Sequence, residues 1–183
     1  RVLFRSAAML KKIGILSTDE YERLHTHLCD ILRLADEGSF TVTQADEDVH
    51  TRVENYLTEH AGEAGKNIHT ARSRNDQVLL DLRLYGKEQL HKVATLLSSL
   101  CRALLDLAAA HAETPMPGYT HMQRAMLSSV GLWATSFAES LLDDEQLLAT
   151  AYQLNDQSPL GSAAGYGVAL AIDRQYVADL LGF

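Results

Sequence analysis

The chain has 183 residues, of which 46% are hydrophobic and 22% are charged, so it is long and apolar enough to bury a globular core. Its 16 basic residues stand against 24 acidic ones, a net charge of -8 without any cluster of lysine and arginine, which argues against nucleic acid or an anionic membrane surface as a partner. Three prolines and 7% aromatic residues are few for the turns of a β-sandwich and favour a helical fold.

Both ends of the sequence differ from the patterns beside them. Arg1–Ser6 does not fit the amphipathic pattern that follows, and it equals one translation of a common sequencing-library adapter. We therefore interpret residues 1–6 as a non-native scar. At the other end, Leu181–Phe183 places a glycine where an apolar helix stops, which is not typical of a natural tail. We expect a chain that is truncated at both ends.

The first part of the chain predicts three helices. Residues 7–16 form a short helix that ends near Gly14. Ser17–Glu20 is a capping box, with a hydroxyl at the N-cap and a carboxylate three residues later, and it opens a helix over about residues 18–37. Acidic side chains on this second helix exclude a DNA-binding helix-turn-helix. The acidic stretch 44–48 opens a third helix, which runs to about residue 60.

Two long helices follow. The first, over about residues 73–112, contains no proline and is roughly 60 Å long at 1.5 Å per residue. Pro115–Gly118 breaks it, and a fifth helix is predicted for about residues 123–155, so the pair forms a long antiparallel hairpin. A hairpin of this size cannot bury its own apolar seams, which predicts an obligate oligomer with a shared helical bundle.

The last part of the chain is less regular. Residues 158–167 form a loop of small residues, and a short helix is predicted for residues 173–181. We expect an all-α protein with two incomplete domains: a short N-terminal helical region over residues 7–68, and the long antiparallel helices of a bundle over residues 69–183.

Cysteine, histidine and hydropathy patterns limit the chemistry. Cys29 and Cys101 lie among leucines with no CxxC pair, as in the reduced core thiols of a cytoplasmic protein. No apolar run reaches about 18 residues and no signal-peptide pattern is present, so neither a membrane span nor export is predicted. Five histidines outside the polar stretches described next lack the carboxylate spacing of a metal site, and residues 158–165 lack the pattern of a phosphate-binding loop.

A first polar stretch, His69–Gln77, lies at the start of the long helix. Free backbone N–H groups and the helix dipole favour an anion there, and Arg72 and Arg74 could add bidentate contacts to a carboxylate. The structural alternative is a well-capped helix with solvated arginines.

A second polar stretch, Pro117–Gln123, lies at the expected start of the fifth helix. Thr120 is a candidate N-cap, and His121 beside it could exchange protons near neutral pH. Two such helix starts would form a dicarboxylate site only if they met across subunits. A third stretch, Glu47–His50, is either a capped helix start with one interior histidine or a further part of that site.

Taken together and in this order, these stretches resemble the argininosuccinate lyases of the fumarase/aspartase superfamily. The resemblance covers nearly all of residues 7–183 and rests on four motifs: Glu47–His50, His69–Gln77, Gly118–Gln123 and Pro159–Ser162. It implies an all-helical homotetramer whose active sites are each formed by three subunits. The implied reaction is the reversible β-elimination of argininosuccinate to arginine and fumarate, with no cofactor and no metal.

The resemblance also implies roles for individual residues. Asn75 and Thr120 match substrate-binding positions, and Ser73 and Arg74 lie beside Asn75 on the same binding segment. His121 matches the catalytic histidine, described in the family as a proton acceptor. A further histidine, His50, is implied to line the same cleft.

Departures from the family pattern leave alternatives open. The family's mobile loop with a catalytic serine and a substrate lysine does not occur in this sequence, and Met126 and Leu127 replace the usual residues after the second motif. We expect the 183-residue chain alone to lack lyase activity. The alternatives are a crystallin-like member kept for structure, and a sister lyase that acts on another succinyl adduct.

Overall fold

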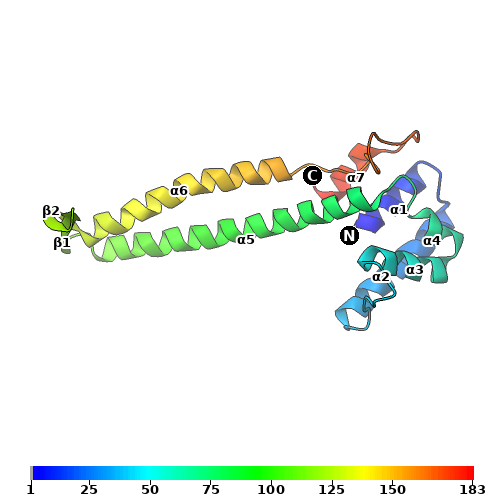
Figure 1. Ribbon diagram of the computed structural model, residues 1–183, viewed down its shortest axis with the longest axis horizontal. Helices are drawn as coiled ribbons and strands as arrows, with labels where there is room; N and C mark the ends of the chain where they lie inside the picture. The colour runs from blue at the N-terminus through cyan, green and yellow to red at the C-terminus, as the bar shows by residue number, and fades with distance from the viewer. Residues whose placement is uncertain (1) are drawn as a thin grey trace. The chain divides into compact units, whose positions relative to one another are not determined.

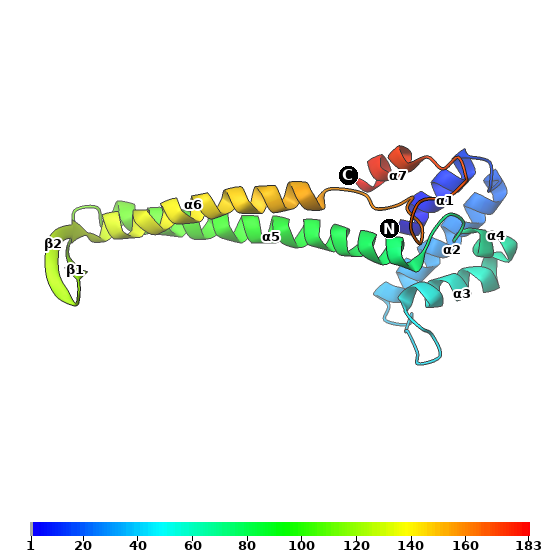
Figure 2. The ribbon, with the colours of Figure 1, turned by 45° about the horizontal axis from the view of Figure 1, so that its top comes forward.

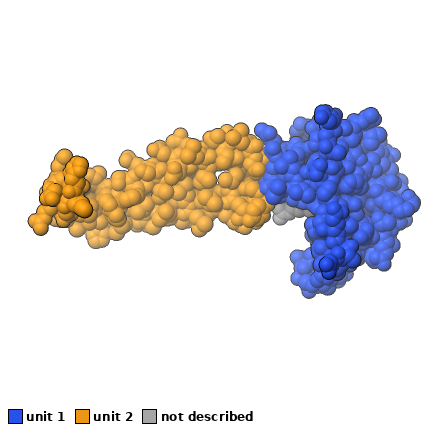
Figure 3. All heavy atoms as spheres, viewed as in Figure 1, with its two compact units in different colours: residues 1–83, 157–183 blue, residues 84–156 orange. Residues whose placement is uncertain are grey.

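The structure is a computed structural model that describes residues 2–183, and it consists of two compact units. One unit comprises the described residues up to Arg83 together with Gln157–Phe183, and the other comprises Leu84–Asp156 (Figure 3). Seven helices and one two-stranded sheet account for the regular structure of the described chain (Figure 1). The expected all-helical fold is therefore confirmed apart from this small sheet.

The first unit begins with α1 (Val2–Lys12) and α2 (Thr18–Asp36). The predicted capping box is confirmed, because the Ser17 N–H donates to Glu20 Oε2 at 2.8 Å and the Glu20 N–H donates to Ser17 Oγ at 3.2 Å. Leucines and an isoleucine on one face of α2 are buried, which packs this helix into the core of the unit.

The start of α1 differs from the expectation. The helix was expected from Ala7, but it begins at Val2, and Ser6 is only 1% exposed. Val2, Ser6 and Met9 recur at spacings of four and three, so they lie on the same buried face. Residues 2–6 are thus part of the folded unit, while Arg1 lies outside the described residues.

The next two helices, α3 (Val49–Ala61) and α4 (Glu63–Asn67), meet at Gly62. The expected helix start near Gln44 is wrong, because Asp46 accepts hydrogen bonds from Thr43 and holds this stretch in a turn. The short α4 was not expected. It depends on Gly65, where a Cβ atom would lie 2.2 Å from the carbonyl oxygen of Leu57.

The last helix, α7 (Arg174–Leu181), belongs to the first unit. Asp173 caps it by accepting from the Tyr176 N–H, and the same carboxylate pairs with Lys12 of α1 at 2.7 Å. The Arg5 Nε–H donates to the Leu180 carbonyl at 3.3 Å. These contacts hold α7 against the start of the chain within the first unit. The expected division into domains at residues 68 and 69 stays a prediction.

The second unit contains most of α5 (Arg74–Ala110), the strands β1 (Pro115–Thr120) and β2 (Gln123–Ser129), and α6 (Val130–Asn155). The helices α5 and α6 run side by side in both ribbon views (Figures 1 and 2). Small residues allow the close approach, since a Cβ atom on Gly131 would lie 2.8 Å from the Cα of Ala112. A cavity of about 360 Å³ opens between the helices further along, beside His91 and Tyr152.

The hairpin formed by β1 and β2 corrects the expected start of the fifth helix. Residues 123–129 were expected to be helical, but they pair antiparallel with residues 115–120, and α6 begins only at Val130. Pro115 and Pro117 favour an extended chain, and Ser129 caps α6 by accepting from the Leu132 N–H at 3.1 Å.

Large apolar side chains remain exposed over both long helices of the second unit. They are Leu96, Leu100, Leu105, Leu132, Trp133, Phe137, Leu142, Leu147 and Leu154. Among the described residues α5 alone is long and apolar enough to cross a membrane, and 11% of its most apolar window is buried. Exposed apolar area on this scale also marks subunit interfaces.

The two cysteines differ in environment. Cys101 is buried, as expected, but Cys29 is exposed, with its Sγ 3.8 Å from Nδ1 of His25. The expectation of two core thiols is therefore wrong for Cys29, because the leucine-rich face of α2 turns its neighbours inward and leaves this position outside.

Candidate functional site

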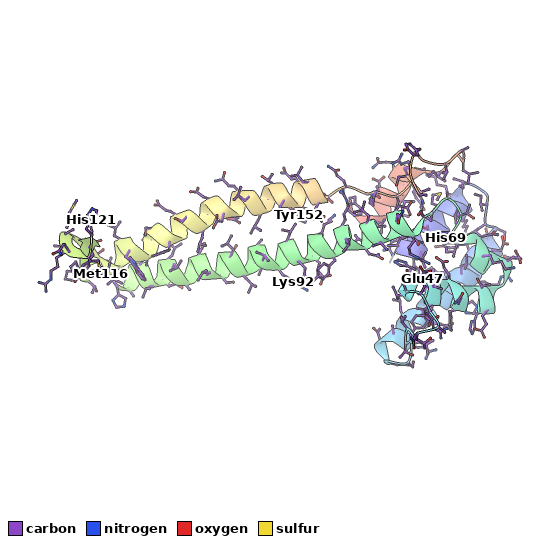
Figure 4. All side chains as sticks on the ribbon, in the orientation of Figure 1. Glu47, His69, Lys92, Met116, His121 and Tyr152 are labelled. Atoms are coloured by element: carbon purple, nitrogen blue, oxygen red, sulfur yellow. The ribbon has the colours of Figure 1, made fainter. Side chains whose placement is uncertain are left out.

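The predicted site residues fall into two sets, one in each unit. His50, Ser73, Arg74 and Asn75 lie in the first unit, at the starts of α3 and α5, and Thr120 and His121 lie in the β1–β2 hairpin of the second unit. Figure 4 labels His69 and Glu47 in the first unit and His121 in the hairpin.

The first turn of α5 is capped by its own side chains. The Ser73 N–H donates to Asp76 Oδ1 at 3.0 Å, and the Asn75 N–H donates to Ser73 Oγ at 3.2 Å. Asp76 is buried beneath this turn, whereas Asn75 is exposed. The helix start therefore presents the amide of Asn75 to solvent from a well-ordered turn.

Arg72 points into the unit and does not contribute to the exposed surface. It is 7% exposed, its Nε donates to Ser6 Oγ at 3.2 Å, and its Nη1 donates to the carbonyl of Ala71 at 3.1 Å. Burial lowers the pKa of its guanidinium, and the Asp76 carboxylate opposes that effect. The expectation that Arg72 offers a bidentate contact to a ligand is wrong for this reason.

Arg74 is held by α3. Its Nε lies 3.0 Å from Asp48 Oδ2, its Nη2 donates to Thr51 Oγ1 at 3.1 Å, and its Nη1 donates to Glu54 Oε1 at 3.3 Å. A fourth bond joins Nη1 to Gln77 Oε1 at 3.3 Å. The guanidinium thus fastens the first residue of α5 to the N-cap and the first two turns of α3.

Sequence reasoning missed Glu54 and Asp81. Glu54 Oε1 lies 3.0 Å from Nδ1 of His69 as well as accepting from Arg74, and Asp81 Oδ2 lies 3.2 Å from Nε2 of His50. The spacing of Asp48, Thr51 and Glu54 by three residues, which places them on one helix face, was an available signal. No such spacing signal indicated that Asp81 is the partner of His50, because Asp81 lies on a different helix.

The second set lies in a tight turn rather than at a helix start. Thr120 pairs with Gln123 as the last register position of the hairpin, so the expected N-cap role of Thr120 is wrong and Ser129 takes that place. The two central residues, His121 and Met122, have φ of 49° and 62°, the pattern of a type I′ turn. Both side chains are exposed.

Apolar side chains are exposed along the hairpin that carries His121. Met122 is 87% exposed and Met126 is 81% exposed, and Tyr119 and Leu127 are exposed as well. In one chain this imidazole therefore lies in water beside uncovered apolar surface, which is typical of a surface that another molecule covers. No group of three or more metal-binding side chains occurs among residues 2–183.

Comparisons with known proteins agree on one family. The family model described as "Lyase" matches residues 2–183. The argininosuccinate lyase of Parabacteroides distasonis is 47% identical over 175 residues, which are 96% of this chain and 39% of that protein. The argininosuccinate lyase of Thermotoga neapolitana is 43% identical over 96% of this chain and 44% of its own length. The chain thus spans about two fifths of these curated relatives.

Solved structures show the same architecture. An EDDS lyase variant with bound fumarate has a TM-score of 0.89 and 25% identity, over 100% of this chain and 35% of that one. A fumarate lyase from Mesorhizobium, at 22% identity and a TM-score of 0.77, shares the fold over 98% of this chain and 42% of its own.

Proposed function

We propose, from the premise that this chain belongs to the lyase family, that its whole protein is an argininosuccinate lyase. The proposed reaction cleaves a carbon–nitrogen bond of argininosuccinate and releases L-arginine and fumarate. The observation that carries the proposal is 47% identity over 96% of the chain with a protein of that name. Similarity to an EDDS lyase variant with bound fumarate supports the product.

The proposed reaction uses both sets of site residues, the one in the first unit and the one in the hairpin, and we call each set a half-site. We propose that Asn75 and Ser73, on the first turn of α5, and Thr120 in the hairpin hold the carboxylates of the substrate. Such groups suit a β-elimination, because loss of a proton beside a carboxylate gives a dianion that ordered donors stabilise. His121 accepts that proton, and the leaving guanidino nitrogen takes one up. His50, next to α5 through Asp81, lines the cleft.

The division of the site residues between two units supports a site that is completed by other copies. Asn75 lies in the first turn of α5, in the first unit, and His121 lies in the hairpin of the second unit. We propose that half-sites from different copies combine in a homotetramer. The apolar side chains that stay exposed on α5 and α6 supply the interface.

The remaining properties follow from the same proposal. Proton transfer and oriented donors need no cofactor, and we propose that the protein uses none. We place it in the cytoplasm, where free thiols such as Cys29 and Cys101 persist. Neither nucleic acid nor a membrane is proposed as a partner.

An activity assay on the full-length protein tests the proposal. Purified full-length protein should release fumarate from argininosuccinate, measured by the ultraviolet absorbance of fumarate. The 183-residue chain alone should release none, because the serine and lysine loop implied by the resemblance does not occur in it. Absence of release by the full-length protein, with its oligomer intact in light scattering, would contradict the proposal.

A further inference from the structure

The segment between α4 and α5 has a strained backbone conformation, which contacts with the surrounding residues must stabilise. Ala71 has a φ of 60°, in the left-handed region that side chains rarely adopt. Local turns fold the segment back, because the Thr70 N–H donates to the Asn67 carbonyl at 3.0 Å and the Arg72 N–H donates to the His69 carbonyl at 3.1 Å. Strained residues of this kind persist only where surrounding contacts fix them.

Both ends of the segment are held by one oxygen atom. Glu54 Oε1 lies 3.0 Å from Nδ1 of His69, at the beginning of the segment, and 3.3 Å from Nη1 of Arg74, at its end. The Glu54 side chain is only 26% exposed, so this contact is partly shielded from water. A single carboxylate on α3 therefore closes residues 69–74 into a loop with Ala71 at its centre.

Arg74 has all three of its guanidinium nitrogens engaged within the chain. Nε contacts Asp48, Nη2 contacts Thr51, and Nη1 contacts Glu54 and Gln77. A guanidinium bound in this way is poorly placed to form a bidentate pair with a substrate carboxylate. It is well placed to fix the direction of the first turn of α5.

We infer that Glu54 is a positioning residue for the substrate site, and that Arg74 acts with it as a strut and not as a substrate ligand. Together they fix the loop 69–74 and the first turn of α5, so that Asn75 presents its amide in one orientation. This inference rests on the proposed function, because it requires that Asn75 binds the substrate.

Substitution of the Glu54 carboxylate in the full-length enzyme should raise KM by a larger factor than it lowers kcat. Glu54→Gln keeps the size of the side chain and one oxygen, but it removes the charge that both His69 and Arg74 contact. We expect kcat/KM to fall about tenfold, mostly through a higher KM, because misplaced binding groups lose affinity in the ground state as well as in the transition state. The thermal midpoint and the oligomeric state are measured alongside.

A double-mutant cycle tests whether Arg74 positions the first turn of α5 together with Glu54 or binds the substrate itself. If Arg74 and Glu54 act as one unit, Arg74→Lys lowers kcat/KM by a similar factor, and the double variant loses no more than either single one. An independent ligand role for Arg74 would instead make the two losses multiply, and that result would overturn the inference.

A rescue by glycine tests the role of the strained loop. Glycine adopts a positive φ readily, so Ala71→Gly should restore at least about a third of the kcat/KM that Glu54→Gln loses. A purely structural role of Glu54 in fastening α3 would not respond to this change. Glu59→Gln, on the exposed face of the same helix, is the matched control and should leave both kinetic constants unchanged.

The outcomes distinguish failure of the positioning role of Glu54 from failure of the proposed lyase function. If the unaltered full-length protein releases no fumarate, the proposed function fails. If it is active and Glu54→Gln matches Glu59→Gln in KM, or Ala71→Gly restores nothing, the function stands and the positioning role is wrong.

Discussion

His121 and Met122 share a backbone conformation that costs a residue with a side chain roughly 1–2 kcal/mol. The two residues lie in succession at the turn of a hairpin, where pairing of β1 with β2 holds them. Backbone outliers of this kind concentrate at functional sites. Here the strained turn carries the imidazole that we propose as the proton acceptor, and that side chain is exposed.

Replacing the imidazole while keeping the turn tests this residue directly. Asparagine tolerates a positive φ better than most residues, so His121→Asn in the full-length enzyme should preserve the fold but lower kcat by about 100-fold or more. Fumarate release measures the loss, and circular dichroism with light scattering confirms that fold and assembly are unchanged. A variant with kcat within threefold of the parent, about 0.6 kcal/mol, would remove His121 from the mechanism.

At the scale of elements, short acidic side chains fix where the helices and turns begin. Backbone N–H groups donate to the carboxylate of Glu20 at the start of α2, to that of Asp46 in the turn before α3 and to that of Asp48 at the N-cap of α3. These bonds lower the pKa of each carboxyl group below its ordinary value. At Asp173 the hydrogen bond from Lys12 is the main cause, followed by the N–H of Tyr176, and the pKa is again lowered.

The direction of these shifts predicts how stability depends on pH. A carboxyl group whose pKa is lowered by folding stabilises the fold above its unfolded pKa, and this contribution is lost as the pH falls through its folded pKa. The ordinary values are 4.5 for Glu20 and 3.8 for the three aspartates. Resistance to urea should therefore not depend on these groups above about pH 5, and it should fall as the pH drops below 4.5.

Urea unfolding followed by circular dichroism, from neutral pH to about pH 3, measures this dependence. Asp48→Asn and Asp173→Asn should each flatten the acid side of the curve, and Glu59→Gln serves as the control on an exposed position. A midpoint that stays constant down to pH 3 in the parent protein would show that the caps do not contribute.

The junction of α3 and α4 depends on a missing side chain. A Cβ atom at position 65 would lie 2.2 Å from the Leu57 carbonyl oxygen, so Gly65→Ala forces the two helices apart. We expect a loss of about 1–3 kcal/mol in the free energy of unfolding, as for other overpacked sites. Lys66→Ala, exposed on the same short helix, is the control and should change stability by less than about 0.5 kcal/mol. Equal stability of the two variants would contradict the crowding.

At the scale of the whole molecule, the two units differ in how much of their apolar side-chain surface they bury. The first unit packs five helices around residues such as Leu10, Leu24 and Leu57, which are fully buried. The second unit has little interior, because two helices and a hairpin cannot enclose a core. Its leucines remain exposed in one chain, and the proposed assembly would bury them.

A charge on this exposed face should disrupt the assembly. Leu96 is 69% exposed on α5, and Leu96→Glu would place a carboxylate in the proposed interface, where an unpaired buried charge is costly. We expect the full-length variant to shift to smaller species and to lose fumarate release with them, because the half-sites no longer meet. Sedimentation velocity measures the shift, with Ser98→Glu on the other side of the helix as the control. An unchanged oligomer would mean that this face is not buried between copies.

The amino-acid sequence by itself determined the features that depend on neighbours along the chain. The capping box at Ser17 and Glu20, the long helix over nearly its full length and the last helix before Gly182 were all predicted, because caps and helical periodicity act within three or four residues. Motif order also predicted the family that the comparisons confirm. Roles of the site residues within that family stay predictions.

Tertiary structure decided the features that depend on distant partners. The stretch 123–129 is compatible with a helix when taken alone, but pairing with β1 makes it a strand and moves His121 from a helix start to a turn. Arg74 could face a ligand or a neighbour, and only the fold of the first unit brings to it Asp48, which is 26 residues away in sequence (74 − 48), and Glu54, which is 20 residues away (74 − 54). Secondary-structure propensity is a weak preference that tertiary contacts override, so the contacts between elements select one alternative in each case.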